Sequence, residues 1–408
     1  MKTGILLSAC MIVKNEENNL ERCLQSIKNL VDEIVVVDTG STDRTIDIAE
    51  QFGARVYHHE WQNNFSLHRN QAMDYAKGRW VLTIDADEEI FTDTGKSFAD
   101  VRDFLNKIDG KFIAAAITVK DIQQGNSVLQ FSSARIFKRG MVEYQGIVHN
   151  QPVLKIDGSS AAHCPFLFIN HYGYDLTPEQ KQAKFLRTSG LLMKQVEMGQ
   201  MEDMLPYFYL CQIYGDNRDA EEAVKWGEKY IENKDKIDKD HFCDSIFFTM
   251  VKQYMRIGDA ANAKRWLEMG IIALPGDLDL ALAALEYGVW VDDLNLQIQA
   301  SKDFTTIYQM YQQDPTLKGN RFVYSQRPEA MAYVLFHQCL AEMKDGVNAM
   351  SNLLRLLSTL HPSFQQGMIK ELEEAFAKTA IPIRIHRDES DKGLSSETEN
   401  NFVSQTIQ

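Results

Sequence analysis

The alternation of apolar runs with helical segments before residue 85 is the feature that most constrains the fold of this chain. Apolar runs with β-branched residues predict buried strands at 6–13, 31–37, 54–57 and 80–84. Between them, apolar residues recur at helical spacing and predict helices at 14–27, 44–52 and 65–76. Strands that alternate with helices form a parallel sheet covered by helices. We therefore predict an α/β domain with a Rossmann-like, doubly wound sheet.

Acidic residues follow two of these strands. The strand at 80–84 runs directly into Asp85 and Asp87, and the strand at 31–37 is followed by Asp38. An Asp-x-Asp sequence alone is often only a solvated turn. However, ligands of such sheets collect at the carboxyl ends of the strands, and both acidic ends lie on that edge. Mg²⁺ and Mn²⁺ prefer oxygen ligands and are often shared between carboxylates and substrate phosphates. The sequence therefore favours a cation and phosphate site there.

The pattern changes twice after this region. Between residues 111 and 170, short β runs at 112–118, 127–131, 134–137, 152–155 and 166–170 predict an antiparallel extension of the sheet. From Thr177-Pro178 onward the chain reads as helices. Within them, Tyr214, Ala223 and Trp226 recur with the same spacing as Tyr254, Ala263 and Trp266, as in stacked helix pairs. We predict an α/β domain at 1–175, an all-α tetratricopeptide-like repeat domain at 176–386 and a disordered polar tail at 387–408.

Composition excludes some partners. The chain of 408 residues carries a net charge of −14, which disfavours nucleic-acid binding because such binding depends on Lys and Arg contacts with phosphates. No apolar run is long enough to span a membrane. The six cysteines are scattered without paired spacing, which indicates reduced thiols and a cytoplasmic protein.

Four motifs stand in order in the first part of the chain: Met11-Ile12-Val13-Lys14-Asn15-Glu16, Asp38-Thr39-Gly40-Ser41-Thr42-Asp43-Arg44-Thr45, Phe65-Ser66-x2-Arg69-Asn70 and Asp85-Ala86-Asp87. With these motifs the chain resembles family 2 glycosyltransferases of the GT-A fold, which have a mixed sheet. The Phe65-Ser66-x2-Arg69-Asn70 motif, the segments at 135–138 and 148–149 and the helical repeats narrow the resemblance to the tetratricopeptide-bearing branch that includes peptide glycosyltransferases acting on bacteriocin precursors.

The resemblance implies a site for a nucleotide-sugar donor, with UDP-glucose the expected one. In that family Asp38 accepts a hydrogen bond from the base, and Arg69 reaches the diphosphate or base. Asp87 ligates a metal ion, Mg²⁺ or Mn²⁺, and Asp85 contacts the ribose or ligates through water. The expected metal ligands are Asp87, Asp85 and His171. The expected donor-binding residues are Val13, Asn15, Glu16, Asp38, Arg69, Asp85, Ala86 and Asp87.

The resemblance also implies inversion of the sugar by direct displacement, which needs a general base for a hydroxyl acceptor. The acid expected after the Val148-His149 segment is absent, because Asn150 and Gln151 follow it. Either His149 or an acid acts as the base, or the acceptor is a thiol, whose pKa of about 8.5 requires less help. The acids considered are Glu143, Glu88, Glu89 and Asp121.

The leading hypothesis is hexose transfer to a Ser, Thr or Cys side chain of a peptide, with a bacteriocin precursor as the expected acceptor. The repeats would be a platform for the peptide or a surface for homodimerisation. Two alternatives stay open. One is a glycosyltransferase of cell-surface polysaccharide or glycolipid synthesis. The other is a non-catalytic scaffold with a nucleotide-sugar-binding domain.

Overall fold

The structure is a computed structural model of the whole chain. It describes residues 4–341 except 124–125, 157, 159, 174–175, 199–203, 234–242, 315–316, 318–324 and 326–327. The predicted tail at 387–408 and the last part of the predicted repeat domain lie outside the described residues. The chain divides into two compact units, Met1–Ile213 and Tyr214–Gln408.

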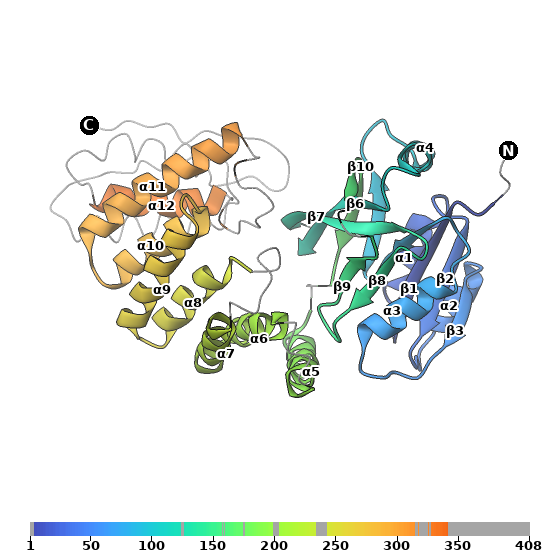
Figure 1. The fold of residues 1–408 in the computed structure, drawn as a ribbon, viewed down its shortest axis with the longest axis horizontal. Coiled ribbons are helices and arrows are strands. Elements are labelled where there is room, and N and C mark those ends of the chain that lie inside the picture. Colours follow the sequence, from blue (N-terminus) through green and yellow to red (C-terminus); the bar gives the residue numbers. More distant parts are fainter. Residues whose placement is uncertain are drawn as a thin grey trace, which may run out of the picture. The chain divides into compact units, whose positions relative to one another are not determined.

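A mixed sheet forms the centre of the first unit (Figure 1). Its strands are β1 (Leu7–Val13), β2 (Glu33–Asp38), β3 (Arg55–His58), β4 (Trp80–Thr83), β5 (Glu88–Thr92), β6 (Ala114–Gln123), β7 (Asn126–Lys138) and β10 (Ala161–His171). They are arranged in the order β3-β2-β1-β4-β7-β6-β10-β5. A separate antiparallel hairpin contains β8 (Val142–Gln145) and β9 (Gln151–Leu154).

Strand pairing confirms the parallel part of the prediction and corrects the extension. β1 pairs in parallel with β2 and β4, and β2 with β3. β7 pairs antiparallel with β4 and β6, but β10 lies parallel to β6 and antiparallel to β5. The extension is therefore mixed, not antiparallel throughout. β7 runs back along β6, so β10 can start from the end of the sheet at which β6 starts and lie parallel to it without a crossover.

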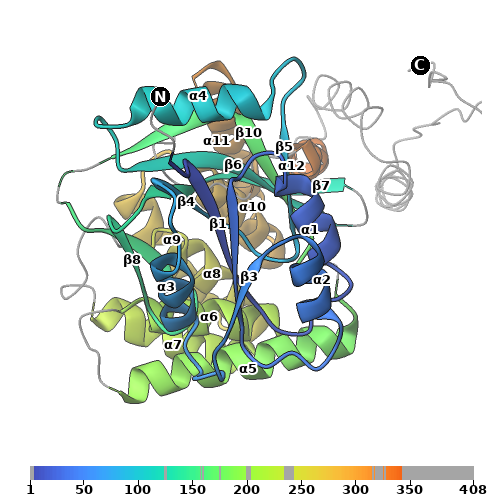
Figure 2. The same cartoon turned by 90° about the vertical axis from the view of Figure 1, so that its right-hand side faces the viewer.

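Helices cover both faces of the strands that end at the acidic edge. Met11 and Val36 pack in one core with α1 (Leu20–Ile27), α2 (Thr45–Gln51) and α4 (Phe98–Ile108). Cys10 and Val35 pack in the other with α3 (Phe65–Asp74) and β8. This alternation follows from the period of two along a strand. Figure 2 shows α1 and α2 on one side of β1 and α3 on the other.

The first helix begins at Leu20, later than the expected start at residue 14. The polar residues before it form a turn in which Asn15 has a left-handed φ of 57°. Asn15 donates its backbone N–H to Ser41 Oγ and accepts a hydrogen bond from Thr42 N. These contacts with the loop after β2 hold the polar run out of the helix.

The helices that follow include a long one in the first unit. α5 (Pro178–Glu197) begins directly after its N-cap Thr177, at the predicted helix start, with a capping box between Thr177 and Gln180. α6 (Leu205–Asp216) spans the boundary between the units. The second unit contains α7 (Ala220–Glu232), α8 (Ile246–Arg256), α9 (Ala260–Ala273), α10 (Leu278–Trp290), α11 (Leu294–Gln313) and α12 (Pro328–Ala341).

The internal repeat is visible as equivalent contacts. Asp219 caps α7, and its backbone N–H donates to Tyr214 O at 2.9 Å. Asp259 caps α9, and its N–H donates to Tyr254 O at 3.0 Å. Ala223 and Ala263 are both fully buried, as expected for small residues between packed helices. In the described part of the chain, no helix has both the length and the apolar composition needed to cross a bilayer.

Candidate active site at the carboxyl edge of the sheet

The loops after β1 and β2 form one wall of the candidate site. The backbone N–H of Thr39 donates to Val13 O, so the two strand ends are held together. Asp38 is buried, and its carboxylate accepts hydrogen bonds from the N–H groups of Gly40 and Ser41. Val13 and Asp38 therefore lie at the ends of two neighbouring strands at the predicted edge, with Asn15 in the loop after β1.

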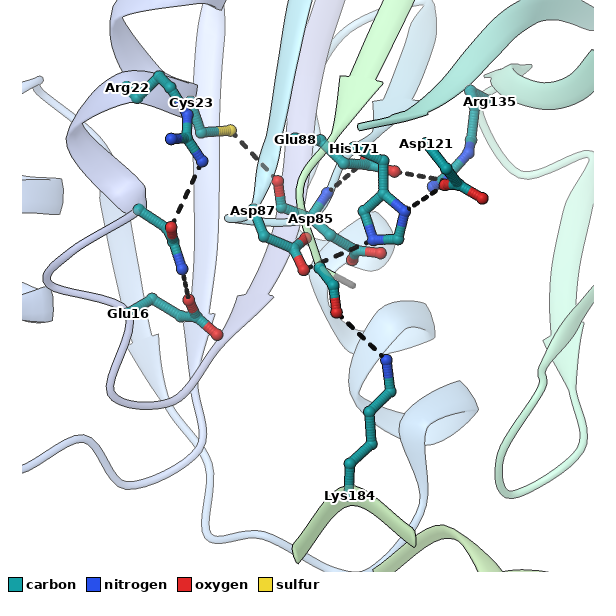
Figure 3. A network of polar contacts seen from close by, with 12 residues as sticks. Glu16, Arg22, Cys23, Asp85, Asp87, Glu88, Asp121, Arg135, His171 and Lys184 are labelled. Atoms are coloured by element: carbon teal, nitrogen blue, oxygen red, sulfur yellow. Dashed lines mark hydrogen bonds and ion pairs between the residues drawn. The ribbon is translucent and has the colours of Figure 1, made fainter. Parts of the chain in front are cut away.

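Asp85 follows β4 and is held from three directions. Arg69 of α3 donates Nη2 to both oxygens of the Asp85 carboxylate, at 2.7 and 2.9 Å. The backbone of Asp85 receives a hydrogen bond from Cys23 Sγ and donates one to Glu88 (Figure 3). Burial opposes ionisation of Asp85, but the guanidinium groups of Arg69 and Arg135 outweigh it and lower the pKa.

Glu88 and Arg135 form a support behind Asp85 that the sequence analysis did not identify as a pair. Glu88 is 1% exposed, and its carboxylate accepts a hydrogen bond from Arg135 Nη2 at 2.7 Å. Glu88 also accepts the backbone N–H of Asp85, so it fixes the turn that contains the acidic motif. Arg135 lies in β7, and only the pairing of β7 with β4 brings it to this position. We therefore regard Glu88 as a positioning residue for the loop.

Asp87 meets His171, which lies at the end of β10. His171 Nε2 is 3.5 Å from Asp87 Oδ2, and Nδ1 is 2.8 Å from Asp121 Oδ1 (Figure 3). Burial disfavours the charged imidazolium, but the carboxylates of Asp121 and Asp87 outweigh it and raise the pKa of His171 to about 10. The imidazole is therefore oriented from behind by Asp121, with its other nitrogen directed at Asp87.

The donor set at Asp87 and His171 fits a divalent cation. A metal-binding histidine commonly donates its second N–H to a carboxylate, as His171 can to Asp121. Gly173 leaves room beside the pair, because a Cβ there would clash with Asp87 Oδ2 and lie 2.5 Å from His171 Nε2. Mg²⁺ and Mn²⁺ need few protein ligands when substrate phosphates supply the others.

Two observations restrict the protein ligands of such a cation to Asp87 and His171. Asp85, the other expected ligand, has both carboxylate oxygens bonded to Arg69. Among the described residues, no three or more His, Cys, Asp or Glu side chains are already grouped as a metal site. Asp87 and His171 could therefore hold a cation only with oxygen atoms from a bound substrate or water.

Glu16 adds negative charge to the same site. Its side chain is partly buried and accepts a hydrogen bond from Asn19. Burial, followed by the carboxylates of Asp87 and Asp85, raises the pKa of Glu16. A cation bound at Asp87 would offset this repulsion. Ala86, between the two aspartates, is buried in the core.

His149 lies in a strained and well-anchored segment. Its φ is 51°, which non-glycine residues rarely adopt, and its ring stacks on Tyr209 of α6 at 4.1 Å. Ile147, two residues earlier, donates its N–H to Gln195 of α5 and accepts the N–H of Phe65. Burial of part of the ring, and then the charge of Lys184, lower the pKa of His149. His149 is therefore a neutral imidazole at neutral pH.

The acidic candidates for a general base are engaged elsewhere. Glu143 is on the outer face of β8, with Lys155 4.0 Å away, and lines a cavity of about 280 Å³ that Asp85 and Asp87 do not line. Glu88 is paired with Arg135, Asp121 with His171, and Glu89 accepts a hydrogen bond from the Tyr172 hydroxyl. Among the predicted bases, His149 thus has the fewest such ion pairs and side-chain hydrogen bonds. Its role as the base stays a prediction.

Lys184 is a residue of this site that the sequence analysis missed. It lies in α5, and its Nζ is 3.4 Å from the carbonyl oxygen of Gly173, beside Asp87 (Figure 3). It is partly buried. No local motif marks this lysine, because only the packing of α5 brings it to the acidic residues.

Comparison with protein families identifies the class of this domain. The model of the family described as "Glycosyl transferase family 2" matches residues 8–149. That segment contains the ends of β2 and β4, which carry Asp38 and the Asp85–Asp87 pair. The segment is therefore a family 2 glycosyltransferase domain with a GT-A-like mixed sheet, and a helical region follows it.

Two curated proteins are similar to somewhat more than half of this chain. The chain is 33% identical over 237 residues to a TPR repeat-containing protein of Synechococcus elongatus, covering 54% of this chain and 55% of that protein. It is 28% identical over 245 residues to the SPbeta prophage-derived glycosyltransferase SunS of Bacillus subtilis, covering 58% and 56%. The match therefore spans about half the length of these curated relatives.

A solved structure also matches part of the chain. It is glucosyl-3-phosphoglycerate synthase from Mycobacterium tuberculosis in complex with Mn²⁺, UDP and glucosyl-3-phosphoglycerate. The identity is 24%, with 34% of this chain and 59% of that chain covered, and the TM-score is 0.26. A TM-score this low gives no support to a functional comparison.

Proposed function

We propose that the protein is an inverting, metal-dependent hexosyltransferase that uses a UDP-sugar, with UDP-glucose the expected donor. The observation that carries the proposal is the convergence of Asp87 and His171 at the carboxyl edge of a family 2 domain, with Asp121 behind the imidazole. The expected compartment is the cytoplasm.

The donor would lie across the loops after β1, β2 and β4. Asp38 would accept a hydrogen bond from the base, with Val13, Asn15 and Glu16 bordering the nucleoside. Arg69 would act mainly by fixing Asp85, since its Nη2 already bonds both carboxylate oxygens. Asp87 and His171 would hold Mg²⁺ or Mn²⁺, which when bound would neutralise charge on the diphosphate.

The transfer is a single displacement at the anomeric carbon. A lone pair on an acceptor oxygen or sulfur forms the new bond, and the bond from that carbon to the β-phosphate oxygen breaks with its electrons on UDP. The acceptor's proton passes to His149 or, for a thiol, to solvent. The neutral imidazole of His149 can take a proton, but its lowered pKa makes it a weak base. This favours an acidic nucleophile such as a Cys thiol.

The role of Asp87 is tested by changing its charge at constant shape. We expect Asp87→Asn to lower Mn²⁺-dependent release of UDP from UDP-glucose by about 100-fold or more, because stabilisation of the leaving group is lost. Asp93→Asn, at an exposed acid after β5, is the matched control and is expected to keep wild-type turnover. Full activity of Asp87→Asn, or of the wild type in excess chelator, would contradict the proposal.

The acceptor is proposed to be a Ser, Thr or Cys of a peptide, in line with the similarity to SunS and the resemblance to peptide-modifying enzymes. Intact mass spectrometry of candidate peptides incubated with the protein and UDP-glucose should show a gain of hexose. Parallel reactions with lipid-linked acceptors test the alternative in surface polysaccharide or glycolipid synthesis. UDP-glucose binding without transfer or hydrolysis would favour a non-catalytic scaffold.

A further inference from the structure

Tyr172, the residue directly after β10, is anchored to three parts of the first compact unit. Its backbone N–H donates to the carbonyl oxygen of Asp87 at 3.0 Å. Its hydroxyl donates to Glu89 of β5 at 2.9 Å. The guanidinium of Arg22, on α1, lies over its ring at 4.1 Å from the centroid. Tyr172 is therefore held to the acidic loop, to β5 and to α1 by three different groups.

These anchors act where the sheet no longer holds the chain. His171 is the last residue of β10 that pairs with β5 and β6. Gly173 lies beyond the sheet, close enough to Asp87 and His171 that an added Cβ would meet both side chains. The contacts of Tyr172 therefore hold the segment that follows the end of the strand.

Arg22 is itself fixed on α1. Its Nη2 donates to Asn19 Oδ1 at 3.3 Å, and Asn19 Nδ2 donates to Glu16 at 3.0 Å. Its Nε is buried and has no hydrogen-bond partner in the part of the chain that the structure describes. The attraction of a cation to an aromatic face is stronger when both are shielded from water. The next residue, Cys23, donates its thiol to Asp85 O at 3.3 Å (Figure 3). This turn of α1 therefore contacts both the acidic loop and the segment after β10.

The binding of a metal ion is sensitive to contacts of this kind, because ligand distances must be correct to within about 0.2 Å. The two proposed ligands lie on different segments, with Asp87 Oδ2 3.5 Å from His171 Nε2. Tyr172 is hydrogen-bonded to one ligand residue and is the chain neighbour of the other. Mutation of residues that support metal ligands typically changes metal affinity by about 10- to 100-fold.

We propose that Tyr172, held by Arg22 and Glu89, is a positioning residue that sets the separation of Asp87 and His171 and thereby the affinity of the site for a divalent cation. This inference rests on the proposed function, because it takes Asp87 and His171 to be the metal ligands. It gives Arg22 an indirect part: the guanidinium orients the segment after β10 through the tyrosine ring.

The test measures Mn²⁺ binding in the presence of UDP, by electron paramagnetic resonance of the unbound ion and without turnover. Tyr172→Leu, which removes the ring and the hydroxyl, is expected to weaken Mn²⁺ binding by about 10- to 100-fold. Tyr172→Phe, which keeps the ring beside Arg22, should stay within about fivefold of the wild type. UDP affinity measured by calorimetry in excess chelator should be unchanged in both variants, because the proposed role concerns only the cation.

Phe168 provides the matched control for the loss of an aromatic ring. It lies on β10, stacks on Phe91 of β5 at 5.4 Å and has Lys120 Nζ 4.6 Å from its ring centroid. Its side chain is half-buried, as is that of Tyr172. Phe168→Leu is expected to lower the unfolding temperature and to leave Mn²⁺ affinity unchanged. If Phe168→Leu weakened Mn²⁺ binding as much as Tyr172→Leu, the proposal would be overturned.

Arg22→Met separates positioning from the charge of the guanidinium. Loss of a positive charge near a cation site would by itself strengthen Mn²⁺ binding. Loss of the contact with the Tyr172 ring is expected to weaken it by about threefold or more. Unchanged or tighter Mn²⁺ binding in Arg22→Met would overturn the proposed role of this contact.

The outcomes separate this inference from the proposed function. If the wild type binds Mn²⁺ together with UDP and Tyr172→Leu binds it equally well, the role of Tyr172 is overturned while the metal site stands. If the wild type binds no Mn²⁺ in the presence of UDP, the proposed metal site and this inference fail together. Thermal unfolding of each variant verifies that the fold is retained.

Discussion

At the residue scale, His149 shows how an unusual backbone can identify a site. A left-handed φ of 51° costs energy for a residue other than glycine, and here the stack on Tyr209 and the bonds of Ile147 maintain it. The sequence suggested His149 through its neighbours but gave no sign of the strain. Strain depends on contacts with α5 and α6, which sequence pattern does not reveal.

The first prediction at this scale concerns the titration of His149. Histidine NMR signals, assigned with His149→Asn, should show a midpoint below the ordinary value of about 6.5. Lys184→Met should raise that midpoint, because one of its two causes is removed. A midpoint at the ordinary value in the wild type would contradict the placement of both residues.

The same shift has a consequence for stability. The folded protein binds the His149 proton less tightly than the unfolded chain does, since the folded-state pKa is lowered. The contribution of His149 to the free energy of unfolding is therefore full above about pH 6.5 and is lost as the pH falls below that value.

The acidic motif shows which contacts of single residues can be predicted from the sequence and which cannot. Arg69 was predicted to approach the acidic motif, and the structure places Arg69 against Asp85 and His171 beside Asp87. Arg69 was expected to reach the diphosphate or the base of the donor. In the structure it bonds the Asp85 carboxylate instead. Lys184 was missed, since a lysine on an amphipathic helix is usually a surface residue and only tertiary packing distinguishes it.

At the element scale, both β10 and α5 contribute residues to the site. His171 is the last residue of β10, and Gly173 lies two residues after it. Lys184 of α5 contacts the carbonyl oxygen of Gly173. The sequence predicted the start of α5 correctly, because the capping box at Thr177 is local. It did not predict the parallel pairing of β10 with β6, because register between distant strands has no local signal.

The prediction at this scale concerns the addition of a single methyl group at position 173. Gly173→Ala should lower Mn²⁺-dependent UDP binding by about tenfold or more, because its Cβ would displace Asp87 Oδ2 and His171 Nε2. Thermal unfolding should show a folded protein, since the change is confined to the site. Binding is measured by calorimetry with and without Mn²⁺.

Gly190→Ala is the matched control for this change. Gly190 lies within α5, and an added Cβ there would have no neighbour within 4 Å. We expect unchanged UDP binding and a gain of up to about 1 kcal/mol in the free energy of unfolding, from better helix propensity. If Gly173→Ala also left UDP binding unchanged, the open space that Gly173 leaves beside Asp87 and His171 would have no role in donor binding.

At the scale of the whole molecule, the order of elements was largely readable from sequence. The strands at 6–13 and 80–84 and the repeated helix pairs depend on periodicity, which is strong in long elements. The strand β5 was not predicted, because it starts with the acidic residues Glu88 and Glu89, which are unusual in a buried strand. Glu88 is buried because it is paired with Arg135 from a strand distant in sequence. The role of the second unit, including the expected homodimerisation, is a prediction from the repeats alone.

The central claim is that Asp87 and His171 hold a divalent cation together with the donor's diphosphate. Anomalous diffraction from crystals grown with UDP and Mn²⁺ tests it most directly. We predict a manganese peak in contact with Asp87 and His171, adjacent to the diphosphate, and its disappearance in Asp87→Asn. UDP bound at the β1 and β2 loops with no manganese beside Asp87, or with manganese at other residues, would contradict the account.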